Sequence, residues 1–156
     1  MCYPVHNPPM DKTAQAPSAK PADHPPATNG KIGVLLVNLG TPDGTDYRSM
    51  WRYLREFLSD PRVIELNKAI WYPILYGLVL TTRPQKSGKN YEKIWNREKN
   101  ESPLRTITRA QGEALAAIFK GEPRIVVDWG MRYGDPSIKS VVERMTAQGV
   151  DRLLTV

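Results

Sequence analysis

The chain has 156 residues, of which 40% are hydrophobic and 24% charged, ordinary values for one globular domain. Its formal net charge is +6, but the lysines and arginines are scattered and no zinc-finger or RNA-binding signature accompanies them, so nucleic-acid binding is not expected. The single cysteine, Cys2, excludes an internal disulfide and indicates an intracellular, cytoplasmic protein, and no apolar stretch reaches the roughly 20 residues of a membrane-spanning helix.

Residues 1–30 differ in composition from the rest of the chain. They hold half of the 14 prolines, and their only aromatic residue is Tyr3. Such a segment cannot bury enough apolar surface to offset its ordering entropy, so the sequence predicts a disordered, proline-rich tail. Both histidines, His6 and His24, lie in this tail, and we interpret them as solvated residues rather than metal ligands.

The folded region is predicted to start with a buried strand and an amphipathic helix. Residues 32–38 are continuously apolar, a pattern typical of a strand covered on both faces. A loop over residues 39–44 follows. From residue 47 to 58 the apolar residues recur at helical spacing, with Thr45 or Asp46 available as the N-cap. The Ser-Asp-Pro sequence at 59–61 then predicts the end of this helix.

The next region is apolar on nearly all sides. Residues 67–80 contain few polar side chains, and Pro73 is expected to bend or interrupt any helix there. Residues 81–88 are polar and cationic, and a short helix is predicted around residues 90–95.

A further helix is predicted to begin at Ser102, a good N-cap that is followed by Pro103 at the first helical position. Gly121 ends it. Its buried stripe is predicted from its apolar residues, which are Ile107, Ala110, Ala114, Leu115, Ile118 and Phe119.

The remaining sequence predicts a second strand over residues 124–129, a loop over 130–135, a helix over 136–148 and a third strand from 152. The order of strand, helices, strand, helix and strand indicates an α/β protein, with a parallel sheet and right-handed crossovers. Because the sequence stops inside a predicted strand, we expect a fragment of a larger, two-domain protein.

Four segments carry a resemblance to a known family. They are VLLVNLGTPD at 34–43, YLREFLSDPRVI at 53–64, ESPL at 101–104 preceded by Tyr91, and MRYGDPSI at 131–138. Together, and in this order, they resemble the ferrochelatases. The resemblance implies a fold of two similar Rossmann-like, chelatase-type domains with the porphyrin in the cleft between them. Residues 31–156 would then form the N-terminal part of the first domain, on the porphyrin-binding side.

The same resemblance implies a function in heme biosynthesis, the insertion of ferrous iron into protoporphyrin IX by a lyase. The family's metal-side residues, a histidine and a glutamate, lie in its later half, so no catalytic or metal-binding residue is expected in this chain. The chain alone is therefore expected to be inactive and to need no cofactor, and the resemblance leaves an iron–sulfur cluster in the full protein open. Two alternatives remain open: a chelatase for another tetrapyrrole and metal, and a non-catalytic porphyrin-binding fragment.

The resemblance also implies particular porphyrin contacts. A flat apolar ring with two propionates needs an apolar cleft with a few cationic or hydroxyl groups, and ligands of parallel sheets bind beyond the carboxyl ends of the strands. The implied positions are Leu39, Gly40, Thr41, Pro42, Arg83, Tyr91, Ser102, Arg132 and Tyr133. The residues alone also admit structural roles: a tight turn at Gly40, a surface charge at Arg83, a core ring at Tyr91 and a helix cap at Ser102.

Residues 70–80 admit two interpretations. One is an ordinary buried helix. The other, which the resemblance favours, is a lip at the mouth of the cleft that touches the inner membrane peripherally. Trp71, Tyr72 and Tyr76 suit such an interface, and replacing Trp71 and Leu75 with serine is expected to weaken it. In that case Arg83, Lys86 and Lys89 would meet anionic lipid headgroups.

Overall fold

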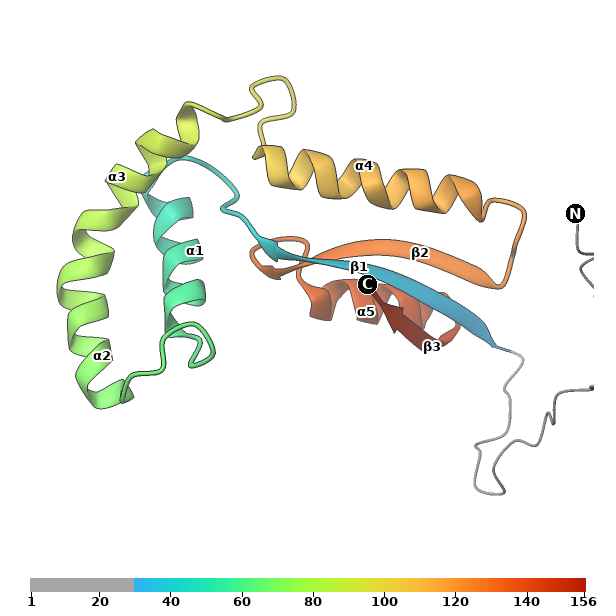
Figure 1. Ribbon diagram of the computed structural model, residues 1–156, viewed down its shortest axis with the longest axis horizontal. Helices are drawn as coiled ribbons and strands as arrows, with labels where there is room; N and C mark the ends of the chain where they lie inside the picture. Colours follow the sequence, from blue (N-terminus) through green and yellow to red (C-terminus); the bar gives the residue numbers. More distant parts are fainter. Residues whose placement is uncertain (1–29) are drawn as a thin grey trace, which may run out of the picture.

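The computed structural model describes residues 30–156. The predicted tail, with His6 and His24, therefore lies outside the described residues except for Gly30. The described part divides into a small sheet with a helix on each face and a group of helices at one end of the sheet (Figure 1).

The sheet has three parallel strands, β1 (Lys31–Gly40), β2 (Ile125–Tyr133) and β3 (Val150–Thr155), in the order β2-β1-β3. The predicted α/β class, with a parallel sheet and flanking helices, is confirmed. β1 and β2 run farther than predicted, because Gly40 and Tyr133 still pair across the ladder where loops were expected. The strand ends carrying residues 39–40 and 131–133 are thereby held against each other.

Helix α4 (Pro103–Ile118) covers one face of the sheet, and α5 (Ile138–Ala147) covers the other (Figure 1). On the α5 side the core is formed by Leu35, Val141 and Met145, each at most 1% exposed. The predicted N-cap of α4 is confirmed, because the Ser102 hydroxyl accepts a hydrogen bond from the Arg105 amide at 3.2 Å.

The predicted buried stripe of α4 is wrong. The residues that α4 buries are Thr108 and Gly112, whereas Ile107 and Ile118 are 55% and 75% exposed. Ala110 and Ala114 are exposed as well, while Leu115 and Phe119 are half-buried. Small residues face the sheet because Trp129 of β2 lies there: a Cβ added at Gly112 would come 2.9 Å from its ring. Both sides of α4 carry apolar residues, so periodicity alone could not choose between them.

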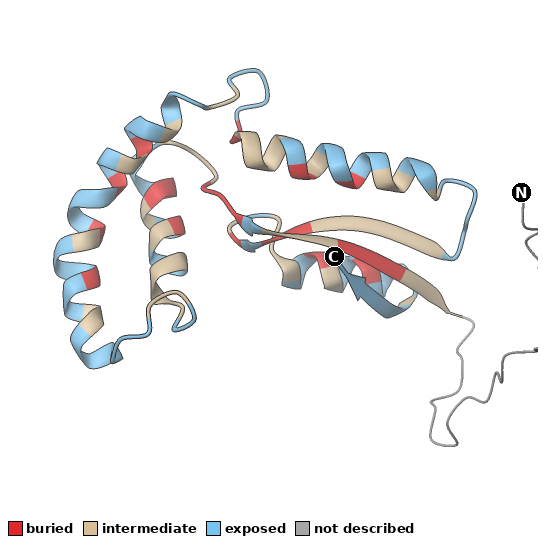
Figure 2. Ribbon diagram, viewed as in Figure 1, coloured by how far each residue is buried: buried red, intermediate tan, exposed pale blue. Residues whose placement is uncertain are grey.

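The remaining helices form a helical arm, residues 47–92, at the carboxyl end of β1 (Figures 1 and 2). It comprises α1 (Tyr47–Ser59), α2 (Lys68–Ile74), the π-helix η1 (Leu75–Val79) and α3 (Leu80–Glu92). The N-cap prediction for α1 holds at Asp46, whose carboxylate accepts from the amides of Arg48 and Ser49. The prediction of a separate helix around 90–95 is wrong, since α3 starts at Leu80 and ends at Glu92.

The arm has a core of its own between α1 and α3. Met50, Leu75 and Leu80 are at most 1% exposed, and Pro84 and Gly88 are buried beside them. A Cβ at Gly88 would lie 2.2 Å from the carbonyl oxygen of Thr45. This packing makes residues 81–88 helical despite their polar sequence, because tertiary contacts override weak local propensity.

Hydrogen bonds from aromatic side chains tie the segments of the arm together. The Trp71 indole N–H donates to the Leu58 carbonyl at 2.8 Å, and the Tyr47 hydroxyl donates to the Leu80 carbonyl at 2.9 Å. Just after Pro73 the α-helix gives way to the π-helix η1, in agreement with the predicted interruption. The arm is therefore one packed unit, which positions its tyrosines and arginines as a group.

Among the helices of residues 30–156, none combines the length and apolar character needed to cross a membrane. The arm nevertheless exposes an apolar row that begins just before α2 and continues along α2 and η1. Its members are separated by four residues each and are between 41% and 63% exposed: Leu66, Ile70, Ile74 and Leu78. Leu75, whose replacement was expected to weaken a membrane contact, is instead fully buried. We refer to Leu66, Ile70, Ile74 and Leu78 as the apolar row.

Candidate functional site

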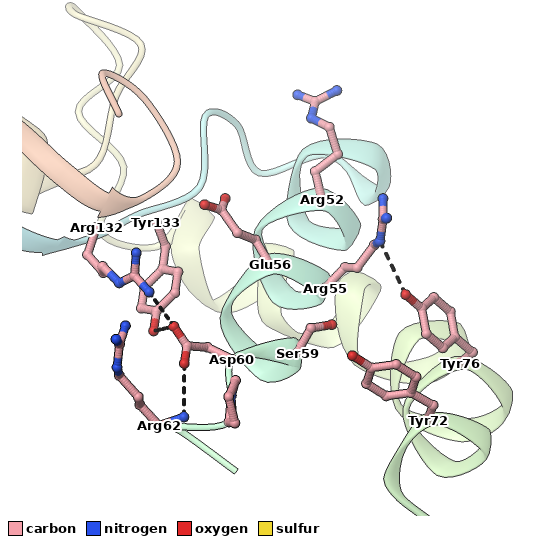
Figure 3. Close-up of a pocket in the computed structure, with 11 residues that line it drawn as sticks. Arg52, Arg55, Glu56, Ser59, Asp60, Arg62, Tyr72, Tyr76, Arg132 and Tyr133 are labelled. Atoms are coloured by element: carbon pink, nitrogen blue, oxygen red, sulfur yellow. Dashed lines mark hydrogen bonds and ion pairs between the residues drawn. The ribbon is translucent and has the colours of Figure 1, made fainter. Parts of the chain in front are cut away.

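A cavity of about 820 Å³ lies where α1 and the turn after it meet the end of β2 and the tyrosines of the arm (Figure 3). Cations and phenol rings dominate its lining, with two carboxylates among them. The lining residues are Arg52, Arg55, Glu56, Ser59, Asp60, Pro61, Arg62, Tyr72, Tyr76, Arg132 and Tyr133. This volume lies within the usual range for small-molecule sites, and the position beyond the carboxyl end of a parallel strand is typical of ligand binding.

Asp60 connects the two sides of this cavity. It caps the C-terminus of α1, and its carboxylate accepts from the Arg62 amide at 2.9 Å, the Arg132 guanidinium at 2.5 Å and the Tyr133 hydroxyl at 3.0 Å (Figure 3). These bonds, above all the one from the Arg62 amide, lower the pKa of Asp60 below its ordinary 3.8. The carboxylate therefore stabilises the fold at neutral pH, and that contribution declines as the pH falls below 3.8 and is lost as it falls through the lowered pKa.

The cations on α1 are held less tightly. The Arg55 Nε donates to the Tyr76 hydroxyl at 3.3 Å, and its guanidinium lies 5.5 Å from the centroid of the Trp51 ring. The Arg52 guanidinium is 3.8 Å from Asp43, with 61% of its side chain exposed. A cavity with guanidinium groups on opposite sides and phenol rings between them can bind an anionic aromatic molecule.

A row of aromatic rings attaches α1 to the sheet beside the cavity. Tyr53 stacks on Phe57 at a centroid distance of 6.0 Å, and Phe57 meets the edge of Tyr133 at 5.2 Å. The Tyr53 hydroxyl also donates to the Gly40 carbonyl at 3.3 Å. Burial raises the pKa of Tyr53 to about 12, with Tyr91 contributing, so its hydroxyl stays protonated at neutral pH.

A second, smaller hollow of about 210 Å³ adjoins the first and shares Arg52 and Glu56 with it. Thr41 and Pro42 line this hollow, and the buried Thr41 hydroxyl has no hydrogen-bond partner among the described residues. Nearby, Arg105 of α4 reaches Asp43 at 2.6 Å and the Asp135 carbonyl at 2.7 Å. This arginine fixes the loops after β1 and β2 to each other.

Comparison with known proteins identifies the family. Residues 31–156 match the family model described as ferrochelatase. The chain belongs to the ferrochelatase family. It is 68% identical to the ferrochelatase of Mesorhizobium japonicum over 146 residues, and these aligned residues make up 94% of this chain and 41% of that protein. It is 62% identical over 145 residues to the ferrochelatase of Brucella anthropi, covering 93% and 41%, and 64% identical over 137 residues to that of Agrobacterium fabrum, covering 88% and 40%.

The chain thus spans about two-fifths of the length of the curated ferrochelatases that it matches. Of the predicted positions in this ferrochelatase-family chain, Arg132 and Tyr133 line the larger cavity. Thr41 and Pro42 line the adjoining hollow, and Gly40 is buried against the Tyr133 backbone.

The other predicted positions lie outside the larger cavity. Leu39 is 53% exposed and lines neither hollow, and Arg83 is exposed on α3. Tyr91 is half-buried, with its ring 6.4 Å from that of Trp95. Ser102 is 1% exposed and caps α4, which is the structural role that its sequence also admitted.

Sequence reasoning missed several cavity residues on the arm. Arg52, Arg55, Glu56 and Ser59 recur at the spacing of one helical face, and Tyr72 and Tyr76 are separated by one turn. This polar face of α1 was a detectable signal. Its function was not, because it depends on how the arm folds against the end of β2.

Proposed function

We propose that the protein carrying this chain inserts ferrous iron into protoporphyrin IX, and that residues 31–156 supply porphyrin-binding elements. The observation that carries the proposal is the cavity in which guanidinium groups from α1, the following turn and β2 converge beside tyrosine rings. Tyrosine rings suit the flat macrocycle, and the guanidinium groups of α1 and the following turn suit its two propionates. Membership in the ferrochelatase family supports the same assignment.

Iron enters this proposal as a substrate. Within residues 30–156 no group of three or more His, Cys, Asp or Glu side chains could hold a metal ion. As the family resemblance implies, we place the metal-side histidine and glutamate in the part of the relatives that this chain does not span. The role of residues 31–156 is to bind and orient the macrocycle.

Porphyrin binding without metallation tests this division of roles. The chain mixed with free-base protoporphyrin IX is expected to shift the Soret band and quench the porphyrin fluorescence, whereas added ferrous iron should produce no heme. The dimethyl ester of the same porphyrin is expected to bind about tenfold or more weakly, since it lacks both carboxylates. Absence of binding by the diacid would contradict the porphyrin assignment, and measurable turnover would contradict the division of roles.

We further propose that the cytoplasmic protein touches the inner membrane peripherally through the apolar row. An exposed series of aliphatic side chains, three of them on α2 and η1, followed along the chain by cations such as Lys86 and Lys89, suits an interface with anionic lipid. Tyr76 of the same segment lines the cavity, so a ligand that partitions into lipid would meet the lip first. Leu75 faces the arm's own core and takes no part in this surface.

Flotation with anionic liposomes tests the membrane contact. Ile70→Ser combined with Leu78→Ser is expected to lower the bound fraction about tenfold or more, because two aliphatic side chains would no longer enter the lipid. The matched control is Ile107→Ser with Ile118→Ser, which removes two aliphatic side chains of comparable exposure from α4. Equal flotation of the two double variants would argue against a lip formed by the apolar row.

A further inference from the structure

Asp60 stands at the junction of the helical arm and the sheet, and 9% of its side chain is exposed. Both carboxylate oxygens are occupied: Oδ1 accepts from the Arg62 amide, and Oδ2 accepts from the Arg132 guanidinium and the Tyr133 hydroxyl. One carboxylate therefore fixes the turn after α1 and two consecutive side chains at the end of β2. Charge-assisted bonds of this kind are short and directional.

The consequences for Arg132 are geometric and electrostatic. A free arginine at the edge of a cavity would sample many rotamers and attract any carboxylate that entered. Paired with Asp60, the guanidinium is fixed in place and its charge is offset. One Nη donates to Asp60, and the guanidinium lies 5.2 Å from the centroid of the Tyr133 ring. Arg132 lines the cavity with 45% of its side chain exposed, so its guanidinium can still donate to a ligand there.

Tyr133 is constrained by the same carboxylate. Its hydroxyl donates its proton to Asp60, which leaves the phenol oxygen as an acceptor. Burial first, and then the bond to Asp60, raise the pKa of Tyr133, so the phenol stays protonated at neutral pH. The pair of residues at the end of β2 thus offers the cavity a fixed donor and a fixed acceptor.

We infer that Asp60 is a positioning residue of this cavity. It acts through Arg132, which it turns from a free cation into a fixed, charge-compensated hydrogen-bond donor, so that the propionates of a bound porphyrin are left to other cations. The inference rests on the proposed function, whose ligand is the dianionic macrocycle. Besides capping α1, Asp60 would therefore set how strongly the cavity prefers a charged over an uncharged ligand.

The test compares free-base protoporphyrin IX with its dimethyl ester on three variants. Asp60→Asn leaves Arg132 uncompensated and is expected to raise the preference for the diacid about tenfold. Arg132→Gln leaves Asp60 uncompensated and is expected to lower that preference about tenfold. The double variant restores the charge balance, so its preference should return close to that of the wild type.

Opposite shifts distinguish positioning from a purely structural role. If Asp60 and Arg132 only supported the fold, each single variant would weaken the binding of both compounds equally. The double variant would then bind both compounds most weakly. These results would overturn the inference. If the wild type binds neither compound, the proposed function fails. Whether Asp60 holds Arg132 in place is then tested by a measurement that needs no ligand. Hydrogen exchange of the Arg132 guanidinium, measured by NMR, should be about tenfold faster in Asp60→Asn, and an unchanged rate would overturn the inference.

Discussion

Replacing Gly40 with alanine is expected to lower the free energy of unfolding by about 3 kcal/mol or more. Gly40 has a φ of 114°, which a residue with a Cβ adopts only under strain. An added Cβ would also lie 1.9 Å from the carbonyl oxygen of Tyr133. Since Gly40 and Tyr133 are partners in the β1–β2 ladder, neither backbone can retreat without breaking the pairing. A loss of this size is a large part of the 5–15 kcal/mol typical of a domain.

Urea unfolding followed by circular dichroism measures this effect. The matched control is Gly121→Ala, because a Cβ at Gly121 meets no atom within 4 Å and the residue has no positive φ. The control is expected to change the free energy of unfolding by at most about 0.5 kcal/mol. Similar unfolding midpoints for the two variants would mean that the end of β1 does not pack against Tyr133 as described.

The features that the sequence predicted correctly are those determined by near neighbours. The strand beginning at Lys31, the cap at Asp46 and the cap at Ser102 depend on residues within one turn or one strand. Continuous apolar runs and capping side chains act locally, so they can be recognised without knowing the fold.

The features that the sequence did not predict are determined by distant contacts. Residues 81–88 look unlike a helix, yet α3 forms because Gly88 packs against Thr45 and Met50 at the start of α1 and Pro84 is buried. Helix α4 turns Gly112 rather than Ile107 toward the sheet, because Trp129 needs the space. Both outcomes depend on the shape of a partner element, which a single segment does not encode.

The residues of the candidate site likewise fall into those that could be predicted from the sequence and those that depend on distant contacts. The family resemblance implied Arg132 and Tyr133 as porphyrin contacts, and their place at the carboxyl end of a parallel strand, where ligands commonly bind, can be inferred from the order of elements. Both residues line the cavity. Arg55 and Tyr76 reach the cavity only because the arm folds back on itself, and the hydrogen bond between them joins residues 21 positions apart. Asp60 pairs with Arg132 across 72 positions.

The second large effect concerns the cations that remain for the propionates. Asp60 compensates Arg132, and Arg52 lies near Asp43. Arg55 lies against Tyr76 and Trp51 without a carboxylate partner, and the Arg62 guanidinium has no acceptor within residues 30–156. In Figure 3 these two arginines flank the cavity from opposite sides of Asp60. Each is therefore expected to bind one propionate.

Arg55→Gln or Arg62→Gln alone is expected to weaken the binding of free-base protoporphyrin IX about tenfold, and the two together about 100-fold, since each removes one charge-assisted hydrogen bond. Binding of the dimethyl ester should change little. Fluorescence titration measures both affinities, and Arg83→Gln is the matched control, because Arg83 is an exposed arginine of the arm outside the cavity. If Arg83→Gln caused the loss and the other variants did not, the propionates would lie along α3. The comparison of the two affinities is decisive, because damage to the fold would weaken the binding of both the diacid and the ester, whereas loss of a propionate contact would weaken only the binding of the diacid.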